Sequence, residues 1–168
     1  MKIRILGGPG SGKSHLAREL SQILHIEYHD LDYVRYDDSD KFVARDKKER
    51  AKILQKLVLK KDWIMEGVYG TQWTYSTYEK ADIIIILHVN RYKRIYRILK
   101  RSIKAHLGII KAKKDTLKQL LEFLRWNWSY EQDDLPKIEA EIKHYTRRRK
   151  TLIFTSADEA LDYFKKRQ

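Results

Sequence analysis

Eight consecutive residues near the start of the sequence have the types and order of a phosphate-binding loop. They fit the pattern G-x-x-x-x-G-K-[ST] in full: Gly7, Gly8, Pro9, Gly10, Ser11, Gly12, Lys13 and Ser14. The glycines let the backbone turn its N–H groups inward, where they can cradle phosphates. Lys13 can reach the β- and γ-phosphates of a nucleoside triphosphate, and the Ser14 hydroxyl can ligate Mg²⁺. We therefore predict that residues 8–15, which include His15, contact a nucleotide such as ATP.

The residues around this loop predict the elements that position it. Ile3 to Leu6 is a short apolar run typical of a buried strand, and it ends where the glycines begin. Apolar residues then recur at helical spacing, at Leu16, Leu20, Ile23 and Leu24. A helix that begins near Lys13 would point its positive end at the phosphates. This context favours a nucleotide site over an ordinary glycine turn with a surface lysine.

Two aspartates follow the second predicted strand, which spans residues 26–29. Because ligands of an open parallel sheet lie outside the carboxyl ends of its strands, Asp30 and Asp32 are candidates for the same site. Of the two we favour Asp32, which could accept the proton of an attacking hydroxyl or hold a Mg²⁺-bound water. An acidic turn or a helix cap is the alternative.

A third strand, predicted over residues 63–65, ends in Glu66 and Gly67. A carboxylate followed by glycine lets a second substrate approach the backbone closely, so we predict that both residues bind the acceptor. The alternative is again a cap or an exposed turn. Asp82 precedes the next predicted strand, residues 83–87, and is expected at the opposite edge of the sheet.

Basic residues are concentrated in one stretch. Residues 91–118 hold 11 lysines and arginines and one acid, Asp115, and so carry +10 of the formal net charge of +13. Arg94, Arg97 and Arg101 share one face of the helix expected here and could clamp a transferring phosphoryl group. The surplus charge indicates a nucleic acid, an anionic membrane surface or a nucleotide as partner, or else only a solvated helix face.

The remaining pattern predicts an α/β fold. A further strand is expected at residues 152–154. Helices are expected at about 40–60, 91–107, 116–130 and 158–165, and another is expected to begin at Pro136. Strands that alternate with helices favour a parallel sheet covered on both faces. Trp126, Trp128 and Tyr130 could offer a ring to a base or could pack in the core.

Composition limits the class of protein. The chain has 168 residues, 42% of them hydrophobic, which suits one domain over residues 1–168 with a real core. It has no cysteine, which excludes a disulfide scaffold, a thiolate zinc site and a cysteine nucleophile. No apolar run approaches the roughly 20 residues that span a bilayer, so we expect a cytoplasmic protein with no membrane partner.

The sequence resembles the adenylate-kinase-like P-loop kinases, the family that includes adenylate kinase and shikimate kinase. Within that family it is most similar to the DNA topology modulation proteins (FlaR-type). The matching segments are Gly7 to Ser14 (the Walker A pattern), Tyr28 to Asp32, Trp63 to Tyr69, Ala81 to Arg101 and Phe123 to Tyr130. The resemblance implies a three-layer αβα fold with a five-stranded parallel sheet of order 2-3-1-4-5. It also implies a mobile helical lid within about residues 91–130.

The resemblance further implies individual roles. Lys13 and Ser14 match the phosphate lysine and the magnesium hydroxyl, and Asp32 falls where the family has its acceptor-site aspartate. Arg97 and Arg101 match two arginines after the fourth strand, one near the adenine and one on the phosphates.

Some positions depart from the family. Glu66 replaces the aspartate usual in nucleoside monophosphate kinases, and Gly70 stands where they often have arginine. Residues 131–134 are acidic where a kinase lid often presents arginine, and residues 108–114 form a short lid segment without metal-binding cysteines.

Together these residues predict an ATP- and Mg²⁺-dependent phosphotransferase, or a slow ATPase, that acts on an unidentified small-molecule acceptor. The predicted catalytic residues are Lys13, Asp32, Arg97 and Arg101. The predicted acceptor-binding residues are Asp32, Glu66, Gly67 and Arg94, and the metal ligand is Ser14. The alternative is a nucleotide-gated DNA-binding regulator that binds DNA weakly through the basic stretch.

Overall fold

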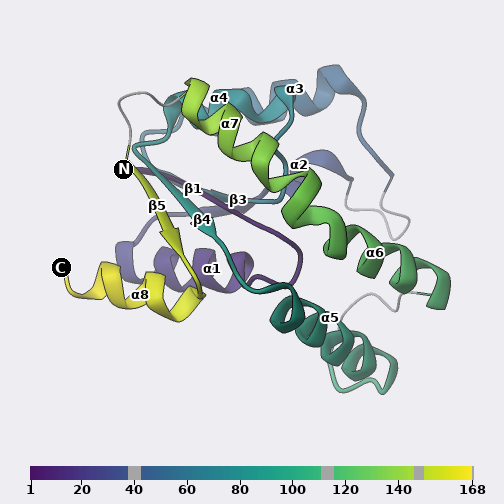
Figure 1. Cartoon of the computed structure of the whole chain (residues 1–168). Coiled ribbons are helices and arrows are strands. Elements are labelled where there is room, and N and C mark those ends of the chain that lie inside the picture. The colour runs from purple at the N-terminus through teal and green to yellow at the C-terminus, as the bar shows by residue number, and fades with distance from the viewer. Residues whose placement is uncertain (38–42, 111–115, 146–149, 168) are drawn as a thin grey trace.

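A five-stranded parallel sheet runs through the middle of the protein (Figure 1). This computed structural model describes residues 1–37, 43–110, 116–145 and 150–167. The strands are β1 (Lys2–Gly7), β2 (Tyr28–Asp30), β3 (Trp63–Glu66), β4 (Ile83–Leu87) and β5 (Lys150–Phe154). Their order is β2-β3-β1-β4-β5, and each neighbouring pair is parallel. The predicted sheet and its order are therefore confirmed.

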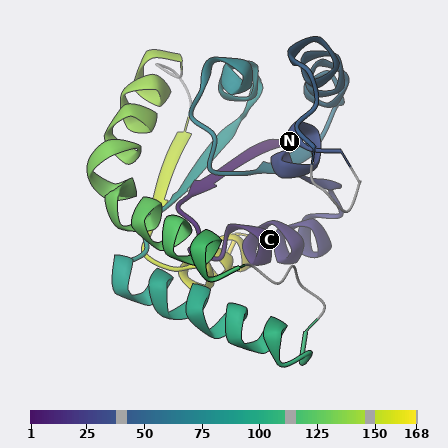
Figure 2. The same cartoon turned by 90° about the vertical axis from the view of Figure 1, so that its right-hand side faces the viewer.

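Helices cover both faces of this sheet. They are α1 (Lys13–Leu24), α2 (Leu31–Arg35), α3 (Lys47–Val58), α4 (Tyr75–Lys80), α5 (Arg91–His106), α6 (Leu117–Asp133), α7 (Leu135–Tyr145) and α8 (Ala157–Lys165), with a 3₁₀ turn, η1 (Gln72–Thr74). Helices α1 and α8 lie on one face, and α3, α4 and α7 on the other (Figures 1 and 2). The result is the three-layer αβα arrangement that the alternation of elements predicts.

Alternate side chains of the central strands build two cores. Ile85 and Leu87 of β4 pack toward α1 and α8, whereas Ile84 and Ile86 pack toward α4 and α7. All four side chains are at most 2% exposed. Because successive side chains of a strand point to opposite faces, a strand buried on both faces needs an unbroken aliphatic run.

Some elements differ from the sequence prediction. The helix expected at about 40–60 covers Lys47–Val58, where Asp46 caps its first turn by accepting from the N–H groups of Lys48 and Glu49. Residues 38–42 and 111–115, which include part of that helix and of the expected lid, lie outside the described residues. The short helices α2 and α4 were not predicted, because five or six residues carry no clear helical period.

Helices α5 and α6 lie beyond the carboxyl ends of the strands, where the sequence places a lid (Figure 2). The Asn90 side chain caps α5 by accepting from the N–H of Tyr92. A capping box of Thr116 and Gln119 begins α6. None of the described helices is long and apolar enough to cross a membrane.

We predict that truncating a buried side chain of the interior strand β4 destabilises the protein far more than truncating an exposed one of the edge strand β5. Ile85 is completely buried, so Ile85→Ala should lower the free energy of unfolding by about 2–5 kcal/mol. Ile153 of β5 is 56% exposed, so Ile153→Ala should cost less than about 1 kcal/mol. Urea denaturation measures both values. Equal losses would contradict the burial of β4 between β1 and β5.

Candidate functional site

The phosphate-binding loop connects β1 to α1. Gly10 and Gly12 have φ angles of +75° and +95°, in the left-handed region that glycine adopts without strain. Gly12 also precedes α1, and no side chain caps this helix. The first N–H groups of α1 therefore point into the loop, where they can bind an anion.

Lys13 faces a buried carboxylate. Its Nζ lies 4.0 Å from Oε2 of Glu66 at the end of β3. The Glu66 side chain is buried, and neither of its carboxylate oxygens accepts a hydrogen bond from any described residue. This carboxylate, buried without a hydrogen-bonded partner, thus lies beside Lys13 at the position where phosphates would bind.

Three carboxylates gather at the ends of β2 and β3. The parallel register places Asp30 opposite Glu66. Burial, and then the charge of Glu66, raises the pKa of Asp30 to about 7. Asp32 lies two residues further on, in the first turn of α2, where it accepts a hydrogen bond from the hydroxyl of Tyr69. Burial and this hydrogen bond raise the pKa of Tyr69, so its hydroxyl remains a donor.

Two cavities meet at the phosphate-binding loop. The larger has a volume of about 860 Å³ and is lined by Asp30, Asp32 and Glu66, among others. The smaller, of about 260 Å³, lies between α1 and α5. Four residues line both cavities: Gly10, Lys13, Ser14 and Arg101.

Most of the other residues predicted to contact a nucleotide line one of the two cavities. Gly12, His15 and Arg97 line the smaller cavity, whereas Pro9 lines the larger. Arg97 donates from Nη1 to the carbonyl oxygens of Ser11 at 3.2 Å and of Gly10 at 3.4 Å, so α5 touches the loop directly.

Three predicted contacts lie beside the cavities without lining them. Gly8 packs under the ring of Tyr130. The Ser11 side chain is buried. Gly67 is buried too, and its carbonyl oxygen accepts from Nη2 of Arg4 at 3.2 Å.

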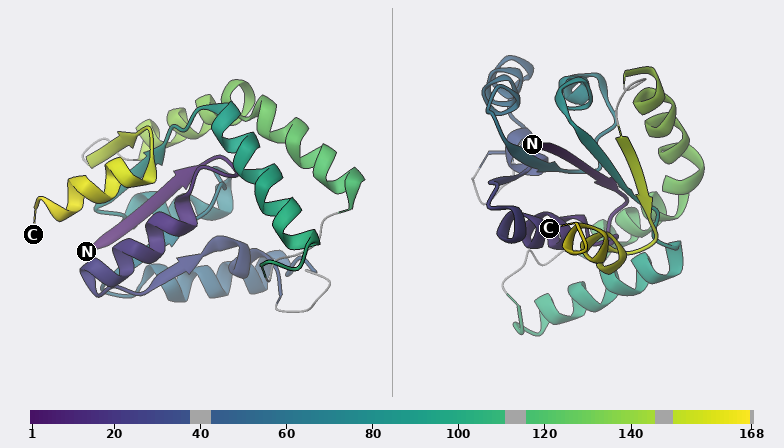
Figure 3. Two further views of the ribbon diagram at one scale, coloured as in Figure 1. Left: turned by 90° about the horizontal axis from the view of Figure 1, so that it is seen from below. Right: turned by 90° about the vertical axis from the view of Figure 1, so that its left-hand side faces the viewer.

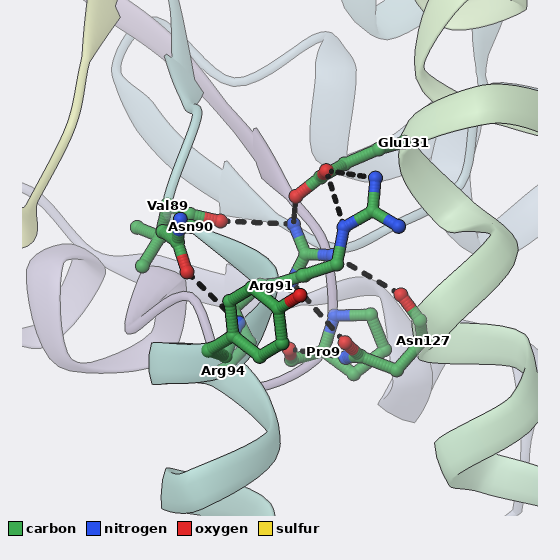
Figure 4. A network of polar contacts seen from close by, with 8 residues as sticks. Pro9, Val89, Asn90, Arg91, Arg94, Asn127 and Glu131 are labelled. Carbon is green, nitrogen blue, oxygen red and sulfur yellow. Dashed lines mark hydrogen bonds and ion pairs between the residues drawn. The ribbon is translucent and has the colours of Figure 1, made fainter.

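Arg94 is not placed as we predicted. It is fully buried, lines neither cavity, and pairs through Nη1 with Glu131 of α6 at 3.1 Å (Figure 4). It also donates to the carbonyl oxygens of Val89 at 3.0 Å and of Asn127 at 3.1 Å. The structure therefore corrects the prediction that Arg94 binds the acceptor. The guanidinium joins β4, α5 and α6 instead.

Asn127 and Arg4 support the site, and the sequence analysis missed both. The Asn127 side chain donates from Nδ2 to the carbonyl oxygen of Pro9 at 2.8 Å, which fastens α6 to the phosphate-binding loop (Figure 4). Arg4 is buried and donates to the carbonyl oxygens of Gly67 and Tyr69, both at 3.2 Å. Arg4 lies within an apolar stretch and Asn127 lies between two tryptophans. A polar residue in such a stretch needs a buried partner, and this was the signal available in the sequence.

Gly70 explains one departure from the family pattern. A Cβ atom at this position would lie 2.2 Å from Cγ1 of Ile138 in α7. A side chain there would clash with α7, so the arginine often found in monophosphate kinases does not fit. No arginine side chain therefore enters the larger cavity from this position.

The residues present fit a magnesium ion bound mainly through a nucleotide. Ser14 is exposed and lines both cavities. Within the described ranges, no group of three or more His, Cys, Asp or Glu could hold a metal by itself. Mg²⁺ commonly keeps waters and substrate phosphates as ligands and needs only one or two protein oxygens.

Comparison with known proteins supports the fold. No protein-family model matches the sequence, and no curated protein matches it. Among solved structures the chain is similar to shikimate kinase from Bacteroides thetaiotaomicron, with 14% sequence identity and a TM-score of 0.52. The match covers 88% of this chain and 97% of that one. At this identity the likeness establishes the P-loop kinase fold alone, as the sequence predicts.

The raised pKa of Asp30 predicts a pH effect on stability. An unfolded aspartate ionises near pH ~3.9, whereas Asp30 in the folded protein ionises at about 7. Between these values the folded state binds more protons, so Asp30 makes stability fall as pH rises. Asp30→Asn should reduce that fall while keeping the oxygen that caps α2. Denaturation at several pH values, with Asp162→Asn as the control for a lost exposed carboxylate, measures it.

Arg94 and Glu131 should be energetically coupled. Arg94→Met leaves Glu131 with Arg91 alone, and should lower the free energy of unfolding by about 3–5 kcal/mol. The double variant Arg94→Met/Glu131→Gln lacks the carboxylate as well. Its loss of unfolding free energy should therefore be about 0.5–3 kcal/mol smaller than the sum of the losses in the two single variants. Strictly additive losses in urea denaturation would show that the pair does not hold α5 to α6.

Proposed function

We propose that this protein is an ATP- and Mg²⁺-dependent phosphotransferase that transfers the γ-phosphoryl group to a hydroxyl of a small molecule. One observation carries the proposal: two separate cavities share Gly10, Lys13, Ser14 and Arg101 as a common wall. A donor in one cavity and an acceptor in the other would therefore meet at the residues best able to bind a phosphoryl group. A hydrolase needs no second cavity of about 860 Å³.

The smaller cavity suits the nucleotide donor. It is lined by the start of α1 and by Arg97, and both can bind phosphates. Lys13 would leave Glu66 and contact the phosphates, where it neutralises the charge that develops during transfer. Mg²⁺, when bound, would screen the phosphate oxygens, and Ser14 is the residue that would hold it.

Asp32 suits the role of the group that orients the acceptor. It is exposed in the larger cavity and is held in place by the Tyr69 hydroxyl. The acceptor oxygen would bond to the γ-phosphorus as the bond to the bridging oxygen breaks, and Asp32 would take the hydroxyl proton. Asp30 is less suited, because its raised pKa leaves it partly protonated at neutral pH.

The larger cavity indicates what kind of acceptor fits. Aromatic rings line it, among them Tyr36, Tyr69, Phe123 and Trp126. The carboxylates beside these rings can accept hydrogen bonds from several hydroxyls. A ring compound with more than one hydroxyl group therefore fits better than an aliphatic anion.

Helices α5 and α6 are the segments suited to excluding water. Arg101 of α5 and Phe123 and Trp126 of α6 line the larger cavity. If these helices close over the substrates, the phosphoryl group passes to the acceptor rather than to water. In their open state, slow hydrolysis of ATP would be the side reaction.

The chemistry and the absence of cysteine suit a cytoplasmic protein.

A DNA-binding role, which the resemblance to topology modulation proteins suggests, has less support. Several charges of the basic stretch have partners within the protein: Arg91 and Arg94 pair with Glu131, and Arg97 contacts the phosphate-binding loop. These arginines do not add to a surface that binds a duplex.

Two variants test the phosphotransferase proposal. Lys13→Ala should lose ATP affinity and at least about 10²-fold in transfer rate. Asp32→Asn should still bind ATP and lose transfer by about 10²–10⁴-fold. The assay follows labelled phosphate from ATP with Mg²⁺ to a panel of nucleosides, nucleotides and polyols, with the exposed Lys80→Ala as control. Unchanged transfer in Lys13→Ala would mean that another site carries the chemistry.

The same assay separates transfer from simple hydrolysis. If no panel member accepts phosphate while ATP is hydrolysed equally by wild type and Asp32→Asn, the protein is an ATPase and the proposed role of Asp32 is wrong.

A further inference from the structure

The outer side of α5 carries an apolar stripe that the described part of the chain leaves uncovered. Tyr92, Tyr96, Ile103 and Leu107 are each 59–69% exposed, and Leu99 is 37% exposed. These side chains recur at spacings of three and four, so they lie on one side of the helix. Seen from below, α5 lies on the outside of the protein with no other helix or strand over it (Figure 3, left).

The orientation of α5 is the reverse of that of an ordinary surface helix. Such helices turn their apolar side toward the core and their charged side toward water. In α5 the buried positions are Arg94, Ile98, Ser102 and Ala105. The buried side thus includes a charged arginine, whereas the largest apolar side chains face outward. The phosphate-binding loop and Glu131 explain why arginines point inward, but they leave the apolar stripe without a partner.

Helix α6 extends this apolar surface. Trp128 is 47% exposed and meets the ring of Tyr92 edge-on, with 6.0 Å between ring centroids. Leu117 and Leu121 are 74% and 49% exposed and share a helix side with Trp128. We call these three residues and the α5 stripe the outer apolar surface. A contiguous exposed apolar area of this kind marks an interaction site.

The charges around the outer apolar surface identify its partner. Exposed or half-buried lysines, Lys93, Lys100 and Lys104, lie beside the stripe on α5, and this helix contains no acidic residue. Lys118 and Arg125 add exposed positive charge on α6. A second copy of the chain would bring like charges together, which is unfavourable. An anionic partner is complementary to this rim.

We propose that the outer apolar surface docks on an anionic lipid bilayer. Tyrosine and tryptophan favour the boundary between hydrocarbon and water, and lysines beside them would contact lipid phosphates. The 16 residues of α5 form a rod about 24 Å long that can lie flat in this interface.

The outer apolar surface lies apart from the cavities of the candidate site. None of the side chains of the outer apolar surface lines either of the two cavities at the phosphate-binding loop. A helical peptide ligand is usually held in a groove, whereas a lipid surface needs only an exposed apolar side with basic flanks. A helix that spans a bilayer must be long and apolar all round, whereas a helix that lies in the interface needs only one apolar side. The proposal also does not depend on the proposed enzymatic activity.

Vesicle sedimentation tests the proposal with the intact protein. At about 0.1 M salt the protein should bind vesicles of phosphatidylcholine mixed with phosphatidylglycerol, and not vesicles of phosphatidylcholine alone. Tyr96→Ser/Ile103→Ser should weaken binding about ten-fold or more, because apolar groups no longer enter the interface. Leu59→Ser, which changes a side chain that is 69% exposed at the end of α3, should have no effect. Lys93→Gln/Lys100→Gln should weaken binding to the mixed vesicles.

Several results would overturn the proposal. The first is that the protein, shown to be folded by circular dichroism, does not bind the mixed vesicles. Another is equal loss of binding in the double variant and in Leu59→Ser. A dimer in size-exclusion chromatography that Tyr96→Ser/Ile103→Ser abolishes would assign the surface to a second copy. Binding of duplex DNA without lipid binding, lost in Lys93→Gln/Lys100→Gln, would assign it to nucleic acid.

Discussion

The site depends on close packing between the phosphate-binding loop and the helices beside it. A Cβ atom on Gly8 would lie 2.9 Å from the ring of Tyr130, and one on Gly10 would lie 2.7 Å from the carbonyl oxygen of Arg94. Asn127 adds a hydrogen bond to the same loop. The path of the loop is therefore set by α5 and α6 as much as by its own glycines. Because of this packing, the inner ends of α5 and α6 and the phosphate-binding loop form one structural unit.

The carboxylates on the other side of the loop depend on strand register. Asp30 and Glu66 come together because β2 and β3 pair in parallel with these residues opposite each other. Burial, and then repulsion from Glu66, raises the pKa of Asp30, and the amino group of Lys13 lies beside Glu66. A bound phosphate would draw Lys13 away. The electrostatics of the two cavities are thus connected through Lys13, which lines both.

Elements that depend on residues close together in the sequence could be predicted from it. The aliphatic run of β4 identified a strand buried on both faces, and the glycine-rich turn identified the phosphate loop. Contacts between distant segments were not predictable in this way. Helical spacing grouped Arg94 with Arg97 and Arg101, but only the packing of α6 shows that Glu131 and Asn127 take Arg94 into the interior. The hydrogen bond between Tyr69 and Asp32 likewise depends on how α2 meets the segment that follows β3.

The position of α5 and α6 in the chain has a consequence for how this fold can change. Strands β4 and β5 pair directly, although residues 88–149 lie between them. The entropy lost on closing such a long connection grows only with the logarithm of its length, so that doubling it costs about 0.6 kcal/mol. Insertions or deletions at the outer ends of these helices therefore hardly affect the sheet. The outer ends of α5 and α6 can diverge in length and sequence, while their inner ends keep the packing on which the phosphate-binding loop depends.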